Sequence, residues 1–342
     1  MSAAEGASLP AGPGRGERAA DFVLPLVSSG QKTRFYARAG GAPCLLVFPG
    51  DGPVELVEQL LLRLRQAGDP LTFGVTSQTH TAALSFPVFL DETGAVVSAY
   101  RLDGAGTSVV LVLDANLRVL GSVRPADGAA AATAAGLLLQ EARRQIEPME
   151  IRAQAPVLLI DNILDGQICE FLQQVWDQGN EETGVEQSQG EARQESIDHQ
   201  NKSRRDHVVA DDKLMKMLST TIGRRVMPEI QRAFAYRATR FEGFKIACYD
   251  SASSGFFHPH RDNLSPTTAH RRFALTLNLN DDYDGGHLRF PEFGPHLYRP
   301  EPGGAVVFAC AHLHEVTRVT RGRRFTLLSF LFGAEEAGAR SQ

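Results

Sequence analysis

Short apolar runs and amphipathic stretches alternate along the first 150 residues. Residues 43–48 form an apolar run with the length of a buried strand, and residues 54–66 then repeat apolar positions at helical spacing. A further strand is predicted at residues 70–75, a hairpin at residues 108–123 and a helix over about residues 129–145. Strands that alternate with helices in this way indicate a layered α/β domain.

The pattern changes in the second half of the chain. A strand is predicted at residues 157–160, and Asp165 is placed to cap a helix over about residues 166–178. A second helix follows over about residues 211–234, and short strands separated by Gly, Pro and Asp turns begin at Thr239. Several short strands at close spacing favour a barrel or a double-sheet jelly roll.

Polar segments between and around these patterns suggest the domain boundaries. We expect a disordered tail at residues 1–18, a tail at residues 334–342 and a linker at residues 148–155. Two domains are left, at residues 19–147 and at residues 156–333.

Residues 179–205 are polar and charged and are longer than an ordinary connection. Such a segment is either a mobile lid or disordered. As a lid it could close over a peptide, a protein side chain or a small molecule. Arg204, Arg205 and Asp206 at its end could contact a substrate, but we favour a solvated face as the interpretation.

Composition and charge narrow the range of functions. The chain is 43% hydrophobic and 22% charged, which is typical of soluble globular proteins and argues against a mainly disordered chain. The net charge is −5 and neither half is basic, so we expect no nucleic-acid partner. The N-terminus lacks the apolar core of a signal peptide, and no apolar run reaches the ~18 residues of a membrane span. We therefore expect a cytoplasmic protein without a membrane partner.

The cysteines give no sign of a metal knuckle or a disulfide framework. They are widely scattered and form no C-x-x-C pair, and we expect them to be small buried hydrophobic residues. The four are Cys44, Cys169, Cys248 and Cys310.

Four phrases in the first domain follow one another in a characteristic order: ADFVLP, PCLLVFPGDGP, FPVFLDETGAVVSAY and SVVLVLDANLRVLGS. With these phrases the domain resembles the redoxin branch of the thioredoxin fold. In that family a reactive cysteine follows the first strand, whereas GDGPVELVEQL has no cysteine here and Cys44 lies inside the strand. Ser108 also replaces the family's proline. The resemblance therefore implies a redox-inactive domain that serves as a scaffold, a homodimer surface or a docking module for a partner.

Histidines concentrate in the second domain. Nine of the ten follow residue 198, and seven lie between His258 and His314. His260 and Asp262 stand two apart, so in a strand both side chains point to the same face. His314, about fifty residues later, adds a third ligand, and two histidines with one carboxylate form the facial triad of non-haem Fe(II) oxygenases. Three other histidines are interpreted as surface or core residues: His270, His287 and His296.

A guanidinium follows this constellation. Arg324, ten residues after His314, can form a bidentate pair with a carboxylate. Between the two metal motifs lie LNDDYDGGHLRFPEFG and PEPGGAVVF, and APVLLIDNILDGQICEFL opens the domain. Over about residues 156–333 the chain resembles the prolyl 4-hydroxylase-like family of Fe(II)- and 2-oxoglutarate-dependent dioxygenases. The resemblance implies a double-stranded β-helix (jelly roll) with supporting helices.

The family's site residues are carried over one at a time. The resemblance implies iron ligands at His260, Asp262 and His314 and co-substrate contacts at Arg324, Tyr249, Asn278 and Thr276. Arg323 should point away from the site if the strand is regular. Asn278 and Thr276 stand where the family often has a tyrosine or threonine, which leaves the second partner of the distal carboxylate open. Arg318 replaces a common proline at the rim of a loop.

The resemblance implies the reaction as well. O₂ and 2-oxoglutarate would be consumed, succinate and CO₂ would be formed, and the default outcome is hydroxylation. The substrate would be a prolyl or other side chain of a protein or peptide, or a small molecule. Ascorbate often accompanies this family and would keep the iron reduced.

Three alternatives stay open at this point. His258 and His260 could form a cupin-type H-x-H site, because His258, like His312, lies two residues before a proposed ligand. The redoxin-like half could be a thiol peroxidase that uses Cys44. The second domain could also be a binding protein on a decayed oxygenase scaffold.

Overall fold

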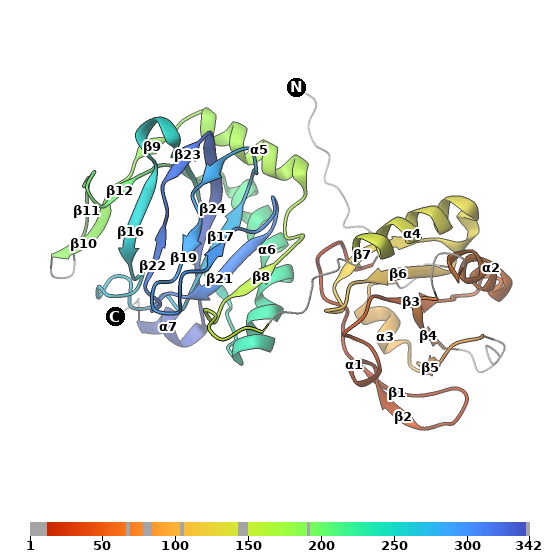
Figure 1. The fold of residues 1–342 in the computed structure, drawn as a ribbon. Helices are drawn as coiled ribbons and strands as arrows, with labels where there is room; N and C mark the ends of the chain where they lie inside the picture. Colours follow the sequence, from red (N-terminus) through yellow and green to blue (C-terminus); the bar gives the residue numbers. More distant parts are fainter. Residues whose placement is uncertain are drawn as a thin grey trace. The chain divides into compact units, whose positions relative to one another are not determined.

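The structure is a computed structural model that describes residues 12–65, 69–77, 84–102, 106–142, 150–189 and 192–339. The chain divides into two compact units, residues 1–148 and residues 149–342 (Figure 1). Each unit has its own sheets and its own buried core, and each is described by itself.

A five-stranded sheet forms the centre of the N-terminal unit, in the order β5-β4-β3-β6-β7 (Figure 1). Three strands run parallel to one another: β3 (Cys44–Phe48), β4 (Leu71–Thr76) and β5 (Val88–Leu90). Two are antiparallel additions: β6 (Val109–Leu113) and β7 (Val119–Val123). A separate pair consists of β1 (Val23–Pro25) and β2 (Lys32–Arg34).

Strand β3 shows why this unit is layered. Its residues are apolar throughout, so alternate side chains enter two different cores. Leu45 and Val47 pack with the core that includes the helices α2 (Val54–Arg65) and α4 (Ala129–Ala142). The opposite face packs with the short helices α1 (Phe35–Arg38) and α3 (Ala95–Ala99). A 3₁₀ turn, η2 (Pro125–Asp127), precedes α4. The predicted α/β layering is confirmed.

Part of the expected N-terminal tail is folded. The N–H of Gly16 donates to the carbonyl of Val119 at 2.7 Å, and the buried Arg118 donates back to the carbonyl of Gly16. Glu17 forms an ion pair with Arg101 at 2.7 Å. Residues 12–18 are therefore not a disordered tail, because their backbone completes the edge of this unit. Residues 1–11 lie outside the described residues.

The C-terminal unit contains two large sheets. The eight-stranded sheet follows the order β8-β21-β17-β24-β15-β13-β9, with β14 paired to β24. Its strands are β8 (Leu158–Ile160), β9 (Glu181–Glu182), β13 (Arg205–Val208), β14 (Arg240–Phe241), β15 (Lys245–Asp250), β17 (Phe273–Asn278), β21 (Ala305–Ala309) and β24 (Arg323–Phe332).

The second sheet follows the order β12-β16-β22-β19-β20. Its strands are β12 (Lys202–Ser203), β16 (Phe256–His260), β19 (Leu288–Arg289), β20 (Leu297–Tyr298) and β22 (His314–Val316). Smaller elements are the pair β10 (Val185–Gln189) and β11 (Ala192–Ser196), the pair β18 (Asp284–Gly285) and β23 (Val319–Arg321), and the 3₁₀ turn η3 (Ser251–Ser253).

The two sheets of this unit share one buried cluster. Ala274, Val306 and Phe308 from the larger sheet pack together with Leu288 and Val316 from the smaller one. Facing sheets with a common core are the arrangement of a jelly roll. The predicted double-stranded β-helix is therefore confirmed for the C-terminal unit.

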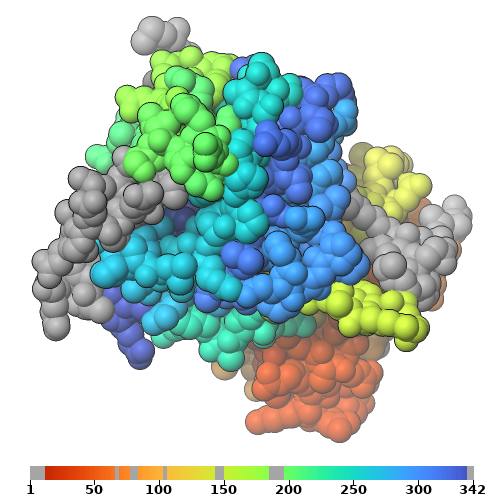
Figure 2. All heavy atoms as spheres, turned by 60° about the vertical axis from the view of Figure 1, so that its left-hand side comes forward, coloured from red at the N-terminus to blue at the C-terminus, as the bar shows by residue number. Residues whose placement is uncertain are grey.

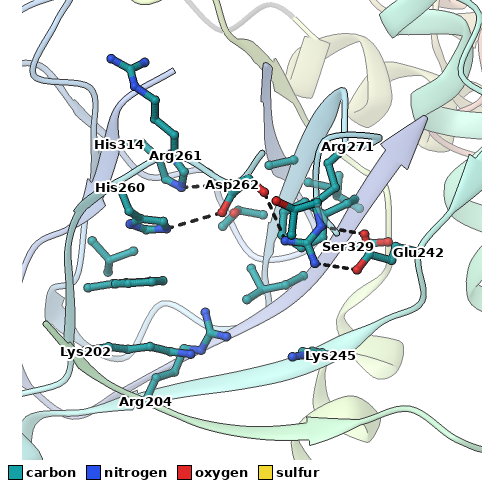
Figure 3. Close-up of a pocket in the computed structure, with 18 of the residues that line it drawn as sticks. Lys202, Arg204, Glu242, Lys245, His260, Arg261, Asp262, Arg271, His314 and Ser329 are labelled. Atoms are coloured by element: carbon teal, nitrogen blue, oxygen red, sulfur yellow. Dashed lines mark hydrogen bonds and ion pairs between the residues drawn. The ribbon is translucent and has the colours of Figure 1, made fainter. Parts of the chain in front are cut away.

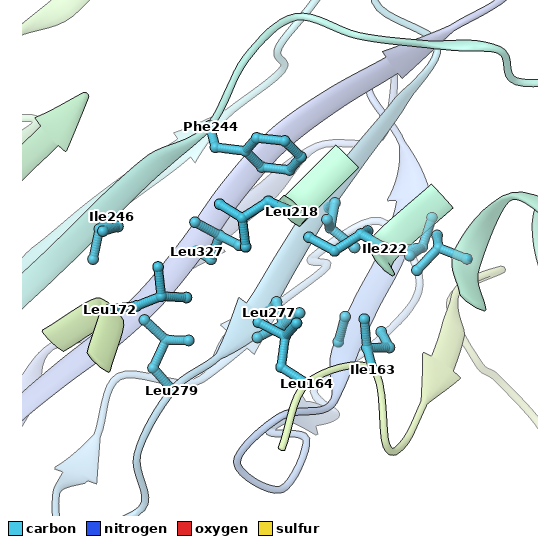
Figure 4. Packing of buried hydrophobic residues seen from close by; sticks show 14 of the residues in the cluster. Ile163, Leu164, Leu172, Leu218, Ile222, Phe244, Ile246, Leu277, Leu279 and Leu327 are labelled. Carbon is cyan, nitrogen blue, oxygen red and sulfur yellow. The ribbon is translucent and has the colours of Figure 1, made fainter. Parts of the chain in front are cut away.

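Helices cover the outer face of the larger sheet (Figures 1 and 4). They are α5 (Gly166–Asp177) and α6 (Asp212–Phe234). A short helix, α7 (Ala334–Ala339), follows β24. On β24, Leu327 and its neighbours at odd positions pack with Leu172 of α5 and Ile222 of α6. Asp165 accepts a hydrogen bond from the N–H of Ile168, which confirms the predicted cap. Even positions of β24 are left for the interior between the sheets.

Three expectations about the polar segments need correction. Residues 179–189 and 192–205 contain four strands and the start of a fifth, so the alternative of disorder is wrong for them. Residues 334–339 of the expected tail form a helix, and Glu336 anchors it by accepting a hydrogen bond from Tyr236 at 2.8 Å, whereas residues 340–342 lie outside the described residues. Within the expected linker, Ala155 is buried against Tyr298.

No helix in the described parts of the chain has both the length and the apolar character that crossing a membrane requires.

Candidate active site

Three predicted ligand residues meet between the two sheets of the C-terminal unit (Figure 3). His260 ends β16 and lies opposite His314, which begins β22. The Nε2 atoms of His260 and His314 lie 3.6 and 3.4 Å from the two carboxylate oxygens of Asp262. One ligand atom from each of the three residues lies within 4.8 Å of the others. A single metal ion fits that spacing for two imidazoles and one carboxylate.

Both imidazoles are oriented by a contact with the backbone carbonyl two residues earlier in the chain. The Nδ1 of His260 lies 2.8 Å from the carbonyl of His258, and the Nδ1 of His314 lies 3.0 Å from the carbonyl of His312. A proton on Nδ1 satisfies each contact and leaves Nε2 with a lone pair directed at Asp262.

The charge state of one ligand also suits a metal. Burial and the neighbouring His314 lower the pKa of His260 to about 4. The imidazole of His260 is therefore neutral near neutral pH, and a metal requires the neutral form.

Buried contacts fix the backbone of Asp262. Its N–H donates to the carbonyl of Cys310 at 3.0 Å, and its own carbonyl accepts from Nη1 of Arg271 at 3.2 Å. Arg271 also donates two hydrogen bonds to the carboxylate of Glu242, at 2.7 and 2.6 Å. Next to the ligand, Arg261 reaches Glu292, whose carboxylate accepts the N–H of the residue before His314.

The cluster opens into a pocket of about 630 Å³. The inner faces of both sheets line it, with aromatic side chains near the ligands. Phe257 stacks on His260 with ring centroids 3.5 Å apart, and Phe308 lies 4.6 Å from His314. Such a lining keeps bulk water away from the ligand atoms.

Arg324 lies at the start of β24 and is 2% exposed. Its Nη1 is buried without a hydrogen-bond partner, and it forms no ion pair within the described residues. A Cβ on Gly286 would lie 3.0 Å from its Cδ, so glycine at that position makes room for the side chain. An uncompensated buried guanidinium is costly, so this environment suits a bound anion.

The three remaining co-substrate candidates differ in outcome. Tyr249 is buried, lines the pocket and lies 5.5 Å, ring centroid to guanidinium carbon, from Arg324. Thr276 is also buried and lines the pocket. Asn278 does not: its amide donates to the carbonyls of Asn280 and Pro300, and its oxygen accepts from Tyr283. The amide of Asn278 is therefore committed to the fold, which does not favour the expected contact at Asn278, and of the two residues only Thr276 lines the pocket.

Three residues near the site in sequence, Arg323, His258 and His270, do not belong to the ligand cluster. Arg323 points to the other face of β24, where its guanidinium lies over Phe325. His258 is exposed and lies outside the ligand cluster, so the cupin-type alternative is not supported. His270 is buried and contacts Glu242 at 3.0 Å, in line with its interpretation as a core residue.

Sequence reasoning missed one wall of the pocket. Arg204 is not part of a solvated face: its side chain is 9% exposed, lines the pocket and donates to the fully buried carboxylate of Asp206. Lys202 and Lys245 line the same pocket. Charged residues stand at every second position, 202, 204 and 206, and this spacing could have predicted a common face. The spacing is hard to recognise because the surrounding segment is also rich in polar and charged residues.

Comparison with known proteins places this site in a family context. Residues 244–332 match the model of the 2OG-Fe(II) oxygenase superfamily. A PKHD-type hydroxylase from Synechococcus sp. (strain JA-2-3B'a(2-13)) is 29% identical over 104 residues, which cover 28% of this chain and 46% of the relative. One from Caulobacter sp. (strain K31) is 39% identical over 67 residues, which cover 19% of this chain and 30% of the relative. These matches span less than half the length of either relative.

A prolyl hydroxylase from Trichoplax adhaerens, in complex with a hypoxia inducible factor peptide fragment, is 17% identical with a TM-score of 0.46. The matched region covers 55% of this chain and 89% of the Trichoplax chain. The family match includes Tyr249, all three clustered ligand residues and Arg324. The C-terminal unit therefore contains a 2OG-Fe(II) oxygenase domain, similar in sequence to hydroxylases of the PKHD type.

Proposed function

We propose that the C-terminal unit is an Fe(II)- and 2-oxoglutarate-dependent dioxygenase that hydroxylates its substrate and releases succinate and CO₂. The observation that carries the proposal is the pairing of two features in one domain. Three ligand atoms converge within 4.8 Å, and a buried Arg324 has an Nη1 without a partner. The first suits a divalent iron and the second suits the distal carboxylate of a dicarboxylate.

His260, Asp262 and His314 would hold the iron. When bound, iron supplies the activation of O₂ that drives oxidative decarboxylation of the co-substrate and oxidation of the substrate. Three protein ligands leave coordination positions open for this chemistry. The protein contributes neutral imidazoles in a fixed orientation and an aromatic lining that excludes water. Ascorbate would keep the iron reduced.

The co-substrate would lie between the ligand cluster and Arg324. The guanidinium would pair with its distal carboxylate, and Thr276 and the hydroxyl of Tyr249 are the polar groups placed to assist. Arg204 donates to that hydroxyl at 3.3 Å, so the tyrosine proton is free to point into the pocket. Tyr249 would then act as a hydrogen-bond donor to a bound anion.

Succinate formation from 2-oxoglutarate tests this proposal without knowledge of the substrate. Purified protein given Fe(II), 2-oxoglutarate and O₂ should form succinate slowly, and Asp262→Ala should abolish this uncoupled turnover. His296→Ala is a matched control, because His296 is exposed and lies outside the ligand cluster. Equal succinate formation by wild type and Asp262→Ala would contradict the proposal. If neither protein forms succinate, the result would favour a binding protein on a decayed oxygenase scaffold.

The substrate is proposed to be a prolyl or other side chain of a protein or peptide, or a small molecule, since the similar proteins are hydroxylases. Cell extract treated with the enzyme and ¹⁸O₂ would gain one labelled oxygen at the modified group. Mass spectrometry would identify that group.

For the N-terminal unit we propose a redoxin-like domain without thiol chemistry. Its sheet runs parallel in β5-β4-β3 and antiparallel through β6 and β7, and the turn after β3 has no cysteine. Cys44 is fully buried in β3, and burial raises the pKa of its thiol to about 12. This does not favour the thiol peroxidase alternative, because a thiolate is the reactive form. A scaffold, homodimer or partner-docking role fits better.

A further inference from the structure

One wall of the pocket carries three cations around one carboxylate. Lys202, Arg204 and Lys245 all line the pocket, and they are called the basic wall below. Their common neighbour is Asp206, whose side chain is fully buried. In Figure 3 the basic wall lies across the pocket from His260 and Asp262. In the space-filling view the green segment that includes β12 and β13 lies beside the cyan segment that includes β16 (Figure 2).

The charges on this wall do not balance. Arg204 takes both oxygens of Asp206, at 2.7 and 2.6 Å, so one cation is neutralised. Burial acts to raise the pKa of Asp206, but the charges of Arg204, Lys202 and Lys245 outweigh burial and lower the pKa, which keeps the group a carboxylate. Within the described residues, Lys245 is therefore left as a cation whose charge the Arg204–Asp206 pair does not offset.

The other acidic residues in the pocket are already committed. Glu242 holds Arg271 through two hydrogen bonds, and Asp262 belongs to the ligand cluster. Neither is therefore available to offset the basic wall. A pocket wall with excess positive charge attracts an anion.

Lys245 is the cation best placed to bind one. It lies on β15 four residues before Tyr249, so both side chains point to the same, pocket-facing side. Its strand neighbours are Val208 and Leu328, which also line the pocket. Lys245 forms no hydrogen bond or ion pair within the described residues, whereas Lys202 donates to the carbonyl of Gly184 at 2.6 Å.

This anion is distinct from the proposed co-substrate. Arg324 pairs with Tyr249 across β24 and β15, and Leu328 pairs with Lys245. The two cations are therefore four residues apart along the strands, about 13 Å of extended chain. A five-carbon diacid held by iron at one end and Arg324 at the other leaves Lys245 for a second anion.

The pocket lining also has an exposed apolar part, and one of its members, Val208, is a strand neighbour of Lys245. Val208 is 59% exposed and Leu264 is 76% exposed, and both lie in the pocket lining. Apolar side chains that line a binding pocket are suited to contact an apolar part of its ligand. A ligand for this region would carry an apolar group next to its anionic group.

We propose that the substrate of this site carries a carboxylate, bound by Lys245, beside an apolar group that contacts Val208 and Leu264. The inference rests on the proposed function and names its substrate class. The carboxylate belongs either to a small acid or to an acidic side chain of a peptide, and the test has an arm for each source.

The test uses full-length protein loaded with Mn(II) and N-oxalylglycine, so that no turnover occurs. Calorimetry measures the affinity for two matched pairs of probes: N-acetyl-leucine against its amide, and a hexapeptide with Leu-Glu against one with Leu-Gln. The proteins are wild type, Lys245→Gln, Lys245→Glu and the control Lys216→Gln, whose lysine is exposed on α6. Circular dichroism checks that each variant folds.

Wild type should prefer the carboxylate member of at least one pair by about tenfold or more, as expected for a charge-assisted hydrogen bond. Lys245→Gln should remove the preference, Lys245→Glu should reverse it, and Lys216→Gln should keep it. A preference in the peptide pair alone or in the acid pair alone supports the proposal and identifies the source.

Two results would overturn it. One is a wild type and a Lys245→Gln variant with the same preference for the carboxylate probes, whether that preference is absent from both or present in both. The other is a loss of N-oxalylglycine affinity in Lys245→Gln as large as the loss of probe affinity, which would assign Lys245 to the co-substrate. Succinate formation is measured separately, so failure of the dioxygenase proposal would show there and not in these binding curves.

Discussion

His260 and His314 face each other across the paired strands β16 and β22, and each is oriented by the carbonyl two residues before it. The backbone of these strands therefore directs both Nε2 atoms at Asp262 before any metal binds. Such outer contacts of ligating histidines set the tautomer and the basicity of the ligand.

Removing one ligand should remove metal binding. His260→Ala leaves two of three ligand atoms, and we expect the affinity for Mn(II) to fall by at least about 100-fold, more than the loss from a supporting residue. Electron paramagnetic resonance of free Mn(II) measures this affinity. His258→Ala is the matched control, because its exposed ring lies outside the cluster while its carbonyl is retained. Equal Mn(II) affinity in His260→Ala would rule out this ligand.

Arg324 should control the affinity for 2-oxoglutarate. Arg324→Ala removes a buried charged donor, and we expect the KM for 2-oxoglutarate to rise by about 10- to 100-fold. The adjacent Arg323→Ala should leave KM near the wild-type value, because Arg323 is half-exposed on the opposite face of β24. An unchanged KM in Arg324→Ala, or equal effects of both substitutions, would argue against this role.

The buried pair of Arg271 and Glu242 should support both stability and metal binding. Arg271→Met leaves a buried carboxylate without its main partner, and we expect a loss of about 3–5 kcal/mol of stability. It also frees the carbonyl of Asp262, so Mn(II) affinity should fall while the three ligands stay in place. Urea denaturation and Mn(II) titration of the same variant measure the two effects. Unchanged values in both would show that the pair is dispensable.

Substitutions of Asn278 and Thr276 should affect different properties, stability for Asn278 and the KM for 2-oxoglutarate for Thr276. Asn278→Ala leaves the carbonyls of Asn280 and Pro300 without a donor, and we expect a stability loss of about 1–3 kcal/mol with little change in KM for 2-oxoglutarate. Thr276→Val keeps the shape of a side chain that lines the pocket, so it should raise KM with little loss of stability. The opposite pattern would return Asn278 to the co-substrate site.

The cysteines should be inert in the folded protein. All four are buried, and burial raises the pKa of each thiol. We therefore expect negligible reaction with a disulfide reagent until denaturant is added, and no peroxide consumption by wild type or Cys44→Ser. Rapid peroxide reduction that Cys44→Ser abolishes would instead support the thiol peroxidase alternative.

The sequence predicted the parts of this protein that depend on local pattern. The apolar run of β3, the cap at Asp165 and the spacing of His260 and Asp262 are all short-range signals, and the structure has each of them. The convergence of His314 with this pair was expected from the ligand set of a facial triad and from the family resemblance, because the pairing of β16 with β22 joins residues about fifty positions apart and leaves no local signal.

Long-range pairing explains what was missed. Residues 12–18 look like a tail because their partners, the strand at Val119 and the side chain of Arg118, lie about one hundred residues away. Arg204 looks solvated because the aromatic neighbours of its guanidinium, Tyr249 on β15 and Phe257 on β16, come from segments about fifty residues away. Asn278 looks available because its partner carbonyl at Pro300 is set by a loop and not by strand spacing.

One titration tests the central claim most directly, namely that a single site holds iron and 2-oxoglutarate together. The affinity for 2-oxoglutarate is measured anaerobically by calorimetry, with and without Fe(II), in wild type, Asp262→Ala and Arg324→Ala. The account predicts tight binding only in Fe(II)-loaded wild type, with Asp262→Ala losing the dependence on iron and Arg324→Ala losing affinity despite bound iron. The same affinity in all three proteins, or no effect of Fe(II) on wild type, would contradict it.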